Sequence, residues 1–280
     1  MPIILSLSSQ VARGHVGHSA AVFAWQRLGI EVVALPTILL SNRPDYPHRA
    51  GERIRPELLG EMLAALDANG WLGEIDAVFT GYLPSAAHVA LAAELVKRLK
   101  AGRPELFYCC DPILGDEPGG LYIAEDAANG IRDTLLPLAD LVTPNRFELQ
   151  WLSGTHVRSG ADAVYAAGKL ARPMVLATSA PAASGDELAN LLVEGPKAWS
   201  TVVGRRVSVP HGTGDLVAAL FLGHLLRSRP AAEAVALATA GIEAVIEASE
   251  GSEELNLIAS QDSWAAPGPW PVTSLDPEAP

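Results

Sequence analysis

The chain has 280 residues, of which 49% are hydrophobic, and carries a formal net charge of −12 at pH 7. This length is enough for one large hydrophobic core. The negative charge repels nucleic acid and anionic membrane surfaces, so neither is expected as a partner. It also repels nucleotide phosphates at long range. A nucleotide site would therefore need local positive potential, such as a helix N-terminus or a bound cation supplies.

The two cysteines, Cys109 and Cys110, are adjacent in the sequence. Neighbouring residues of a strand point to opposite faces, so we expect no disulfide between them, and no spacing is typical of a zinc site. Residues 1–7 lack the basic region of a signal peptide, and no apolar run reaches the about 20 residues of a membrane span. We therefore expect a soluble, cytoplasmic protein.

Short apolar runs alternate with longer, alanine-rich amphipathic segments. In chain order, the pattern predicts strands at residues 3–7, 31–36, 77–80, 106–110, 141–143, 173–177 and 191–193. It predicts helices at residues 19–28 (capped by Ser19), 56–69, 85–100, 216–227 and 231–247. Strands that alternate with helices are typical of an α/β fold, with a mostly parallel sheet covered on both faces.

The absence of an internal repeat or a long linker favours one domain, which we place at residues 1–264. Residues 265–280 are rich in proline and are expected to form an irregular tail. In open α/β sheets, ligands bind beyond the carboxyl ends of the strands, so chemistry is expected just after each strand.

The segment Gly212-Thr213-Gly214-Asp215 opens a long apolar helix and is the most informative for chemistry. Glycines let backbone amides face one concavity, and a helix start adds unpaired N–H donors, which together make an anion hole. Asp215, in or beside the first helical turn, could accept the proton of a hydroxyl group that attacks a phosphoryl group. The alternative is an ordinary loop with an aspartate helix cap.

Two other phosphate-binding motifs are absent from the sequence. There is no Gly-x4-Gly-Lys-Ser/Thr segment, which excludes a P-loop, and no Gly-x-Gly-x-x-Gly follows the first strand, which leaves a dinucleotide-binding Rossmann site without support.

Three segments together resemble the ribokinase superfamily of sugar, nucleoside and vitamin kinases. Besides the glycine-rich segment at 212–215, residues 143–149 resemble its Asn-x-x-Glu element, and residues 110–116 resemble the Asp-Pro-Val-Met-Gly-Asp stretch of its vitamin kinases. The resemblance implies a ribokinase-like three-layer αβα sandwich with a central, mostly parallel sheet.

Within this superfamily, the chain most resembles pyridoxal (vitamin B6) kinases, over residues 3–262. Residues 14–20 resemble their Gly-His-x-Gly-Asn-x-Ala loop, and Leu40-Ser41-Asn42 and Gly81-Tyr82-Leu83 fall at their Phe-Ser-Asn and Gly-Tyr-Leu positions. Hydroxymethylpyrimidine kinases are related, but they typically carry cysteine at the position of Asp215.

The resemblance implies roles for individual residues. Asp215 would be the base that deprotonates the 5′-hydroxyl, with the amides of Gly212, Thr213 and Gly214 facing the transferred phosphate. Asp111 and Glu148 would hold Mg2+ and Asn145 would orient Glu148. The residues assigned to ATP phosphates or a monovalent cation (K+ or Na+) are Thr143, Thr178 and Ser179. The alternatives are salt bridges of Asp111 and Glu148 to arginines, and simple loop hydroxyls for the threonines.

Around the acceptor, the resemblance implies that Ser9 contacts the pyridine ring and that Tyr82 walls it, although Tyr82 could equally fill the core. His15 could contact the ligand, but a structural histidine bonded to backbone is favoured. Residues 116–122 resemble a mobile flap over ATP, with an ordinary turn as the alternative.

The chain departs from the family at several positions. Pro44 stands where a threonine usually helps to bind the substrate; proline has neither that hydroxyl nor an N–H, and Asp45 could replace the contact. His18 stands where asparagine is usual, and residues 178–185 are altered. These changes leave the B6 vitamer, and the acceptor itself, open.

The implied partners are ATP, a B6 vitamer and a second copy of the chain in a homodimer. Two other functions remain: a kinase of another small alcohol, such as hydroxymethylpyrimidine or a sugar, and a weakly catalytic protein that binds B6 or nucleotide. An intact Asp215 argues against the binding protein, because a binder has no need of a base.

Overall fold

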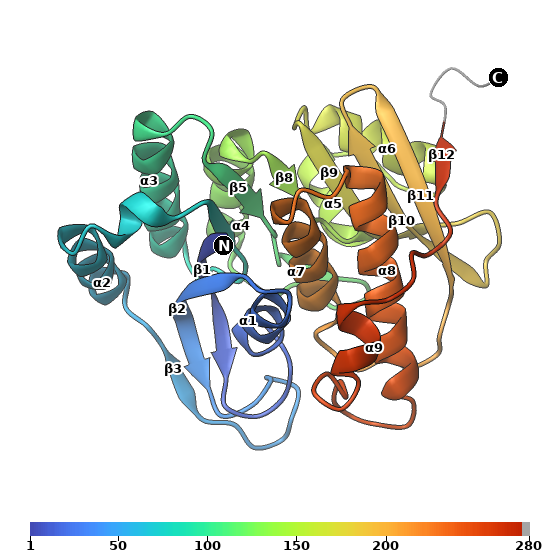
Figure 1. The fold of residues 1–280 in the computed structure, drawn as a ribbon, viewed down its shortest axis with the longest axis horizontal. Helices are drawn as coiled ribbons and strands as arrows, with labels where there is room; N and C mark the ends of the chain where they lie inside the picture. The colour runs from blue at the N-terminus through green and yellow to red at the C-terminus, as the bar shows by residue number, and fades with distance from the viewer. Residues whose placement is uncertain (276–280) are drawn as a thin grey trace.

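The computed structural model describes residues 1–275, which form a ten-stranded sheet covered by helices (Figure 1). The strand order is β12-β11-β10-β9-β8-β5-β4-β1-β2-β3. The strands are β1 Ile3–Val11, β2 Glu31–Leu40, β3 Gly51–Arg53, β4 Ala77–Thr80, β5 Phe107–Cys110, β8 Leu141–Val142, β9 Met174–Pro181, β10 Glu187–Glu194, β11 Lys197–Gly204 and β12 Thr273–Leu275. The run from β2 to β9 is parallel, and both edges of the sheet are antiparallel. The predicted α/β class, with a mostly parallel sheet, is confirmed.

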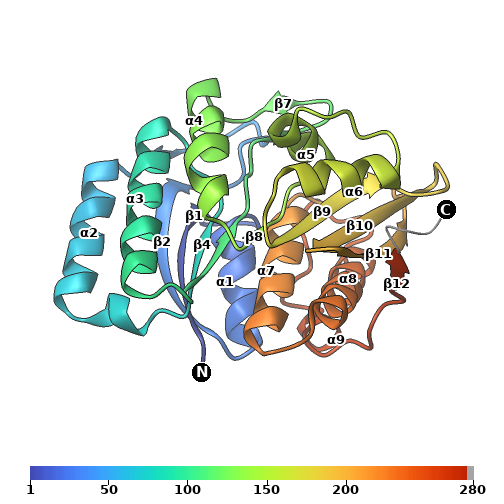
Figure 2. The ribbon, with the colours of Figure 1, turned by 90° about the horizontal axis from the view of Figure 1, so that it is seen from above.

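Helices cover both faces of the sheet, which gives three layers (Figure 2). One face carries α2 Pro56–Ala68, α3 Ala86–Gly102, α4 Glu125–Gly130, α5 Arg146–Ser153 and α6 Gly160–Lys169; the other carries α1 His18–Arg27, α7 Thr213–Leu226, α8 Ala231–Ala248 and α9 Gln261–Ala265. Short helical turns lie at Trp71–Glu74, Ile131–Leu135 and Leu136–Leu138. Cys109 and Cys110 are free, and they pack into the separate cores on opposite faces.

Every predicted strand and helix is present, but the boundaries and several elements differ. Helix α1 begins at His18 with Gly17 as its N-cap, so the prediction of Ser19 as the cap is wrong. The Ser19 hydroxyl instead donates to the Val11 carbonyl at 2.7 Å, which ties the helix start to the end of β1. The sequence analysis did not identify α4, α5, α6, α9, β3, β11, β12 or the small β6–β7 hairpin.

The proline-rich tail is not wholly irregular, because β12 pairs antiparallel with β11. Trp270 also donates from Nε1 to the Val202 carbonyl at 2.9 Å. Residues 276–280 lie outside the described residues, and the division at residue 264 stays a prediction. Within residues 1–275, no helix is long and apolar enough to cross a membrane.

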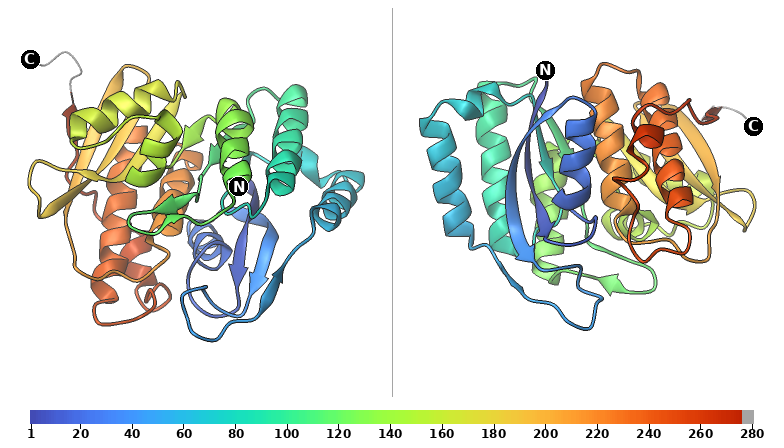
Figure 3. Two further views of the ribbon diagram at one scale, coloured as in Figure 1. Left: turned by 180° about the vertical axis from the view of Figure 1, so that it is seen from behind. Right: turned by 60° about the horizontal axis from the view of Figure 1, so that its bottom comes forward.

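The parallel strands β1, β4, β5, β8 and β9 end at one edge of the sheet, so the loops that follow them meet there. The loop after β2 and the β6–β7 hairpin lie at the same end of the molecule (Figure 3, right). Helix α7 also begins there, because Gly212 lies against the carbonyl group of His15 in the β1–α1 loop. The fold therefore gathers the polar segments singled out in the sequence at one edge.

Candidate active site

The turn that opens α7 depends on a glycine. Gly212 is the N-cap of the helix and has φ 98°, in the left-handed region that favours glycine. A Cβ atom at this position would overlap the His15 carbonyl oxygen. The first helical turn, Thr213-Gly214-Asp215, has no intrahelical partners for its N–H groups and so provides donors for an anion.

Asp215 lies in the first turn of α7, where its carboxyl group faces the β1–α1 loop. The backbone N–H of Gly17 donates to this carboxyl group. Burial raises the pKa of Asp215 to about 6, and the Gly17 amide partly opposes the rise. Gly17 can approach so closely because it has no side chain: a Cβ atom there would overlap Ser9. A carboxyl group with this pKa is mostly ionised at neutral pH and can act as a base.

Asp111 and Glu148 are buried beside this turn, with relative exposures of 6% and 3%. Burial raises the pKa of Asp111 well above its ordinary value, and the nearby charges of Glu148 and Asp215 raise it further. Burial likewise raises the pKa of Glu148 to about 7. Three carboxyl groups from β5, α5 and α7 therefore face one another, although they are separated in the sequence.

These carboxylates fit a magnesium site by their chemistry. Neither Asp111 nor Glu148 forms a salt bridge with an arginine or lysine within residues 1–275, so the alternative of structural ion pairs is not observed there. In the same part of the chain, no group of three or more acidic, histidine or cysteine side chains could hold a metal alone. Mg2+ needs only one or two carboxylates when phosphate oxygens and water complete its shell.

Asn145 and Glu148 hold each other at the start of α5 in a capping box. The Glu148 backbone N–H donates to Asn145 Oδ1 at 3.0 Å, and the Asn145 N–H donates to Glu148 Oε2 at 2.9 Å. The other oxygen, Oε1, accepts from the Leu114 N–H at 2.8 Å, and Asn145 Nδ2 donates to the Gly115 carbonyl at 2.8 Å. The helix start is thus bonded to the segment that leads into the predicted flap.

The predicted flap is a two-stranded hairpin, β6 Gly115–Asp116 and β7 Gly120–Leu121. Burial raises the pKa of Tyr122, and so does its hydrogen bond to Asp116 across the hairpin. Of the two alternatives for residues 116–122, a simple turn is therefore too small a description, although motion of the hairpin stays a prediction.

The remaining residues predicted to bind nucleotide lie at the ends of β8 and β9. Thr143 is buried and faces Asp111 closely enough to lower that pKa, although its hydroxyl makes no well-formed hydrogen bond within residues 1–275. Thr178 is buried too, and its N–H donates to the Pro144 carbonyl at 2.9 Å. Ser179 is exposed with φ 53°.

On the acceptor side, Tyr82 is half-buried against the core, and its backbone is fixed by two hydroxyl groups. Ser8 Oγ accepts from the Tyr82 N–H at 3.2 Å, and Thr37 Oγ1 donates to the Tyr82 carbonyl at 2.6 Å. Ser9 is half-buried at the end of β1 beside Gly17. His15 Nδ1 lies 3.4 Å from the Ser19 carbonyl, in keeping with the structural alternative for this histidine.

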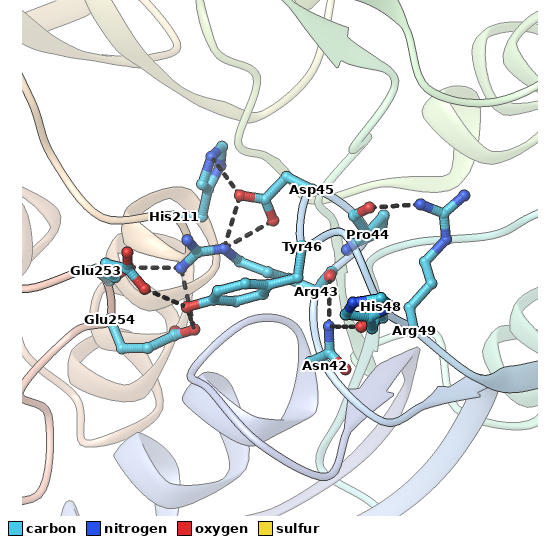
Figure 4. A network of polar contacts seen from close by, with 10 residues as sticks. All are labelled: Asn42, Arg43, Pro44, Asp45, Tyr46, His48, Arg49, His211, Glu253 and Glu254. Atoms are coloured by element: carbon cyan, nitrogen blue, oxygen red, sulfur yellow. Dashed lines mark hydrogen bonds and ion pairs between the residues drawn. The ribbon is translucent and has the colours of Figure 1, made fainter.

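The loop after β2 differs from the simplest expectation for Asp45. Both carboxylate oxygens of Asp45 accept from Nε of Arg43, at 2.7 and 3.0 Å, and Pro44 is exposed (Figure 4). At the other departure from the family, His18 is buried, and its Nε2 lies 2.8 Å from Ser6 Oγ. The roles of Pro44 and Asp45 at the acceptor stay predictions.

Sequence reasoning missed several groups that shape this site: the Gly17 amide, the Leu114 amide and Arg43. A backbone amide carries no residue-type signal. The burial of Arg43 depends on partners at residues 253–254, more than 200 positions away.

A helix N-terminus, a base in its first turn and two carboxylates that can hold a metal are what phosphoryl transfer to an alcohol requires. The fold and this arrangement define the chain as a small-molecule kinase, and residues 45–257 match the family model described as phosphomethylpyrimidine kinase. The chain is 38% identical over 272 residues to pyridoxal kinase PdxY of Rubrobacter xylanophilus, covering 94% of each chain. It is 37% identical over 283 residues to the PdxY of Deinococcus radiodurans, covering 94% of this chain and 93% of that one.

Solved structures agree with these relatives. The fold matches that of pyridoxal kinase from Leishmania donovani in complex with ADP and pyridoxamine, with a TM-score of 0.92, 30% identity, and coverage of 98% of this chain and 100% of that one. The chain belongs to the pyridoxal kinase family, which confirms the family predicted from its motifs.

Proposed function

We propose that this protein transfers the γ-phosphate of ATP to the 5′-hydroxyl of pyridoxal, giving pyridoxal 5′-phosphate and ADP. The observation that carries the proposal is the position of Asp215. Its carboxylate lies in the first turn of α7, next to the helix N–H donors and beside two buried carboxylates. The relatives named pyridoxal kinase support the choice of acceptor.

In the proposed reaction, Asp215 accepts the proton of the 5′-hydroxyl as its oxygen bonds to the γ-phosphorus. The bond from that phosphorus to the bridging oxygen breaks, and ADP leaves with the electron pair. The N–H groups of Gly212, Thr213 and Gly214 face the negative charge of the transferred group. A pKa of about 6 keeps Asp215 ionised at pH 7 without making it too weak a base.

The nucleotide side of the site is assigned by chemistry. Asp111 and Glu148 would hold Mg2+, which neutralises phosphate charge when bound. Both oxygens of Glu148 already accept backbone N–H bonds, so this residue suits contact through water. Asn145 keeps Glu148 in place. Thr143, Thr178 and Ser179 are assigned to the ATP phosphates or to a monovalent cation such as K+ or Na+.

On the acceptor side, Ser9 and Tyr82 are assigned to the pyridine ring, with Pro44 and Asp45 on the loop that borders it. Structures of the Leishmania donovani pyridoxal kinase with ADP and pyridoxamine or pyridoxine support a pocket that accepts several B6 vitamers. A homodimer and a cytoplasmic location complete the proposal. Both rest on the resemblance to pyridoxal kinases, and light scattering tests the dimer.

The match to the phosphomethylpyrimidine kinase model favours hydroxymethylpyrimidine as a second candidate acceptor. An ATP-consumption assay with pyridoxal, pyridoxamine, pyridoxine and hydroxymethylpyrimidine decides between them. We expect kcat/KM to be highest for a B6 vitamer. Turnover of hydroxymethylpyrimidine alone would reassign the acceptor, and binding of B6 without turnover would indicate a binding protein.

A further inference from the structure

Arg43 is an unusual arginine because it is buried in a loop. It lies in the connection after β2, and only 8% of its surface is exposed. Its neighbours Pro44 and Asp45 on the same loop are exposed. A buried guanidinium group is stable only where it is paired and its N–H groups are bonded.

The partners of Arg43 come from two distant parts of the chain (Figure 4). Within its own loop, Nε donates to both oxygens of Asp45, and the guanidinium lies 4.5 Å from the centre of the Tyr46 ring. Across the fold, Nη1 donates to the Glu253 carbonyl at 2.6 Å and lies 3.1 Å from Glu254 Oε1. The arginine thus joins the 41–50 loop to the segment that follows α8.

Tyr46 strengthens the same connection. Its hydroxyl donates to Glu254 Oε1 at 2.8 Å and lies 3.3 Å from Glu253 Oε2. Arg43, Tyr46 and Glu254 therefore form a closed set of contacts. Without the guanidinium, Asp45 would lose its charge partner and the two glutamates would face the loop with no cation from Arg43.

This cluster touches both segments that hold the proposed base. Asp45 Oδ2 lies 3.7 Å from Nε2 of His211, the residue before Gly212. On the other side, Glu254 lies against Gly14 of the β1–α1 loop, where an added Cβ atom would be 2.8 Å from Oε2. The 41–50 loop is therefore docked beside the turn that carries Asp215.

We propose that Arg43 is a positioning residue that latches the 41–50 loop over the acceptor side of the site through Asp45, Tyr46 and residues 253–254. The latch orders the loop before the acceptor binds, so the acceptor does not have to supply the ordering free energy. The effect on catalysis rests on the proposed kinase function, whereas the docking of the loop does not.

The test compares Arg43→Ala with Arg49→Ala, a matched control in the same loop. Arg49 is exposed and makes one hydrogen bond, from Nη1 to the Pro44 carbonyl at 2.7 Å. For Arg43→Ala we expect the KM for pyridoxal to rise at least about 10-fold, with kcat and the KM for ATP within about 3-fold. We expect Arg49→Ala to leave all three within about 2-fold.

Hydrogen exchange gives a readout that does not depend on the acceptor. The amides of Ser41 and Ala50 are bonded within the loop, to the Ala50 carbonyl and to Ser41 Oγ. In Arg43→Ala these amides should exchange at least about 10-fold faster, while those of β1 keep the wild-type rate. Unchanged exchange in the loop would overturn the latch, whatever the acceptor proves to be.

The latch and the kinase function can fail separately. If wild-type protein fails to phosphorylate any B6 vitamer, the proposed function falls, and faster loop exchange in the variant still supports the latch. If Arg43→Ala does not fold, Glu254→Gln keeps the side-chain shape and removes one charge, and it should give the same pattern to a smaller extent. A variant that loses kcat and ATP affinity equally would contradict the proposal, because it would show general damage to the site.

Discussion

The α-carbon of Gly212 lies directly against the carbonyl oxygen of His15, so the turn that opens α7 and the loop after β1 are in contact. That contact brings the Gly17 N–H to the carboxyl group of Asp215. The position of the proposed base is therefore set by two glycine-containing segments about 200 residues apart in the chain, and not by the motif at 212–215 alone.

Gly212→Ala should disrupt this arrangement. The new methyl group would overlap the His15 carbonyl, and φ 98° is strained for alanine, so the turn must move and carry Asp215 with it. We expect kcat/KM to fall at least about 100-fold. The control is Gly168→Ala in α6, where nothing lies within 4 Å of the added Cβ atom. Steady-state kinetics of both variants checks this, and a Gly212→Ala enzyme with normal activity would show that the turn is not the anion site.

Activity should fall on the acid side through the pKa of Asp215. The proposed base works only when it is ionised, and in the folded protein its pKa is raised from 3.8 to about 6. We expect kcat/KM to be highest above that value and to decrease about 10-fold for each pH unit well below it. A pH–rate profile between pH 4.5 and 8 measures this. A profile that is flat from pH 5 to 7 would argue against Asp215 as the base.

The crowded carboxylates should make the metal-free protein less stable as pH rises. The pKa of Glu148 is raised from 4.5 to about 7 and that of Asp215 from 3.8 to about 6, while that of Asp111 is raised well above 3.8. Groups with raised pKa values bind protons more tightly in the folded state. Stability is therefore lost as pH increases from about 4 to about 7.

Asp111→Asn removes one of these three acidic groups. At pH 7, without divalent cations, we expect its free energy of unfolding to exceed that of the wild type by about 1 to 3 kcal/mol, since each pKa unit corresponds to about 1.4 kcal/mol. The gain should vanish near pH 4. With ATP and Mg2+ only the wild type should be stabilised further, and turnover of the variant should be at least about 100-fold lower. Denaturant unfolding at both pH values checks this, and a destabilised metal-free variant would contradict it.

Asn145→Ala separates a helix cap from a role in the site. Loss of an N-cap side chain costs about 1 kcal/mol, and Ser159→Ala in α6 provides a matched loss, because Ser159 Oγ accepts from the Asp162 N–H at 3.1 Å. Both variants should lose similar stability. Only Asn145→Ala should raise the Mg2+ concentration needed for half-maximal activity, because it also frees Glu148 and the Gly115 carbonyl. Equal magnesium dependence in the two variants would reduce Asn145 to a cap.

The sequence carried much of the fold because its strands and helices show regular apolar patterns. It carried less where one residue does two jobs. Asn145-x-x-Glu148 was interpreted only as a binding element, although the same spacing is a capping-box signature and could have located α5. Strand β12 could not be found locally, because proline-rich residues precede it and its pairing with β11 is long-range.

The candidate site divides in the same way. Asp111, Glu148 and Asp215 were predicted because each follows a strand or opens a helix, and parallel topology brings such ends together. The Arg43 cluster had no local signal, because an arginine in a polar loop is normally exposed and its partner carbonyl lies 210 residues away.

The most direct measurement is the turnover of Asp215→Ala with ATP, Mg2+ and pyridoxal, together with its affinity for ATP by calorimetry. Loss of a positioned base should lower kcat at least about 100-fold and leave the ATP dissociation constant within about 3-fold. Turnover equal to that of the wild type would remove Asp215 from the reaction and contradict the account of the site.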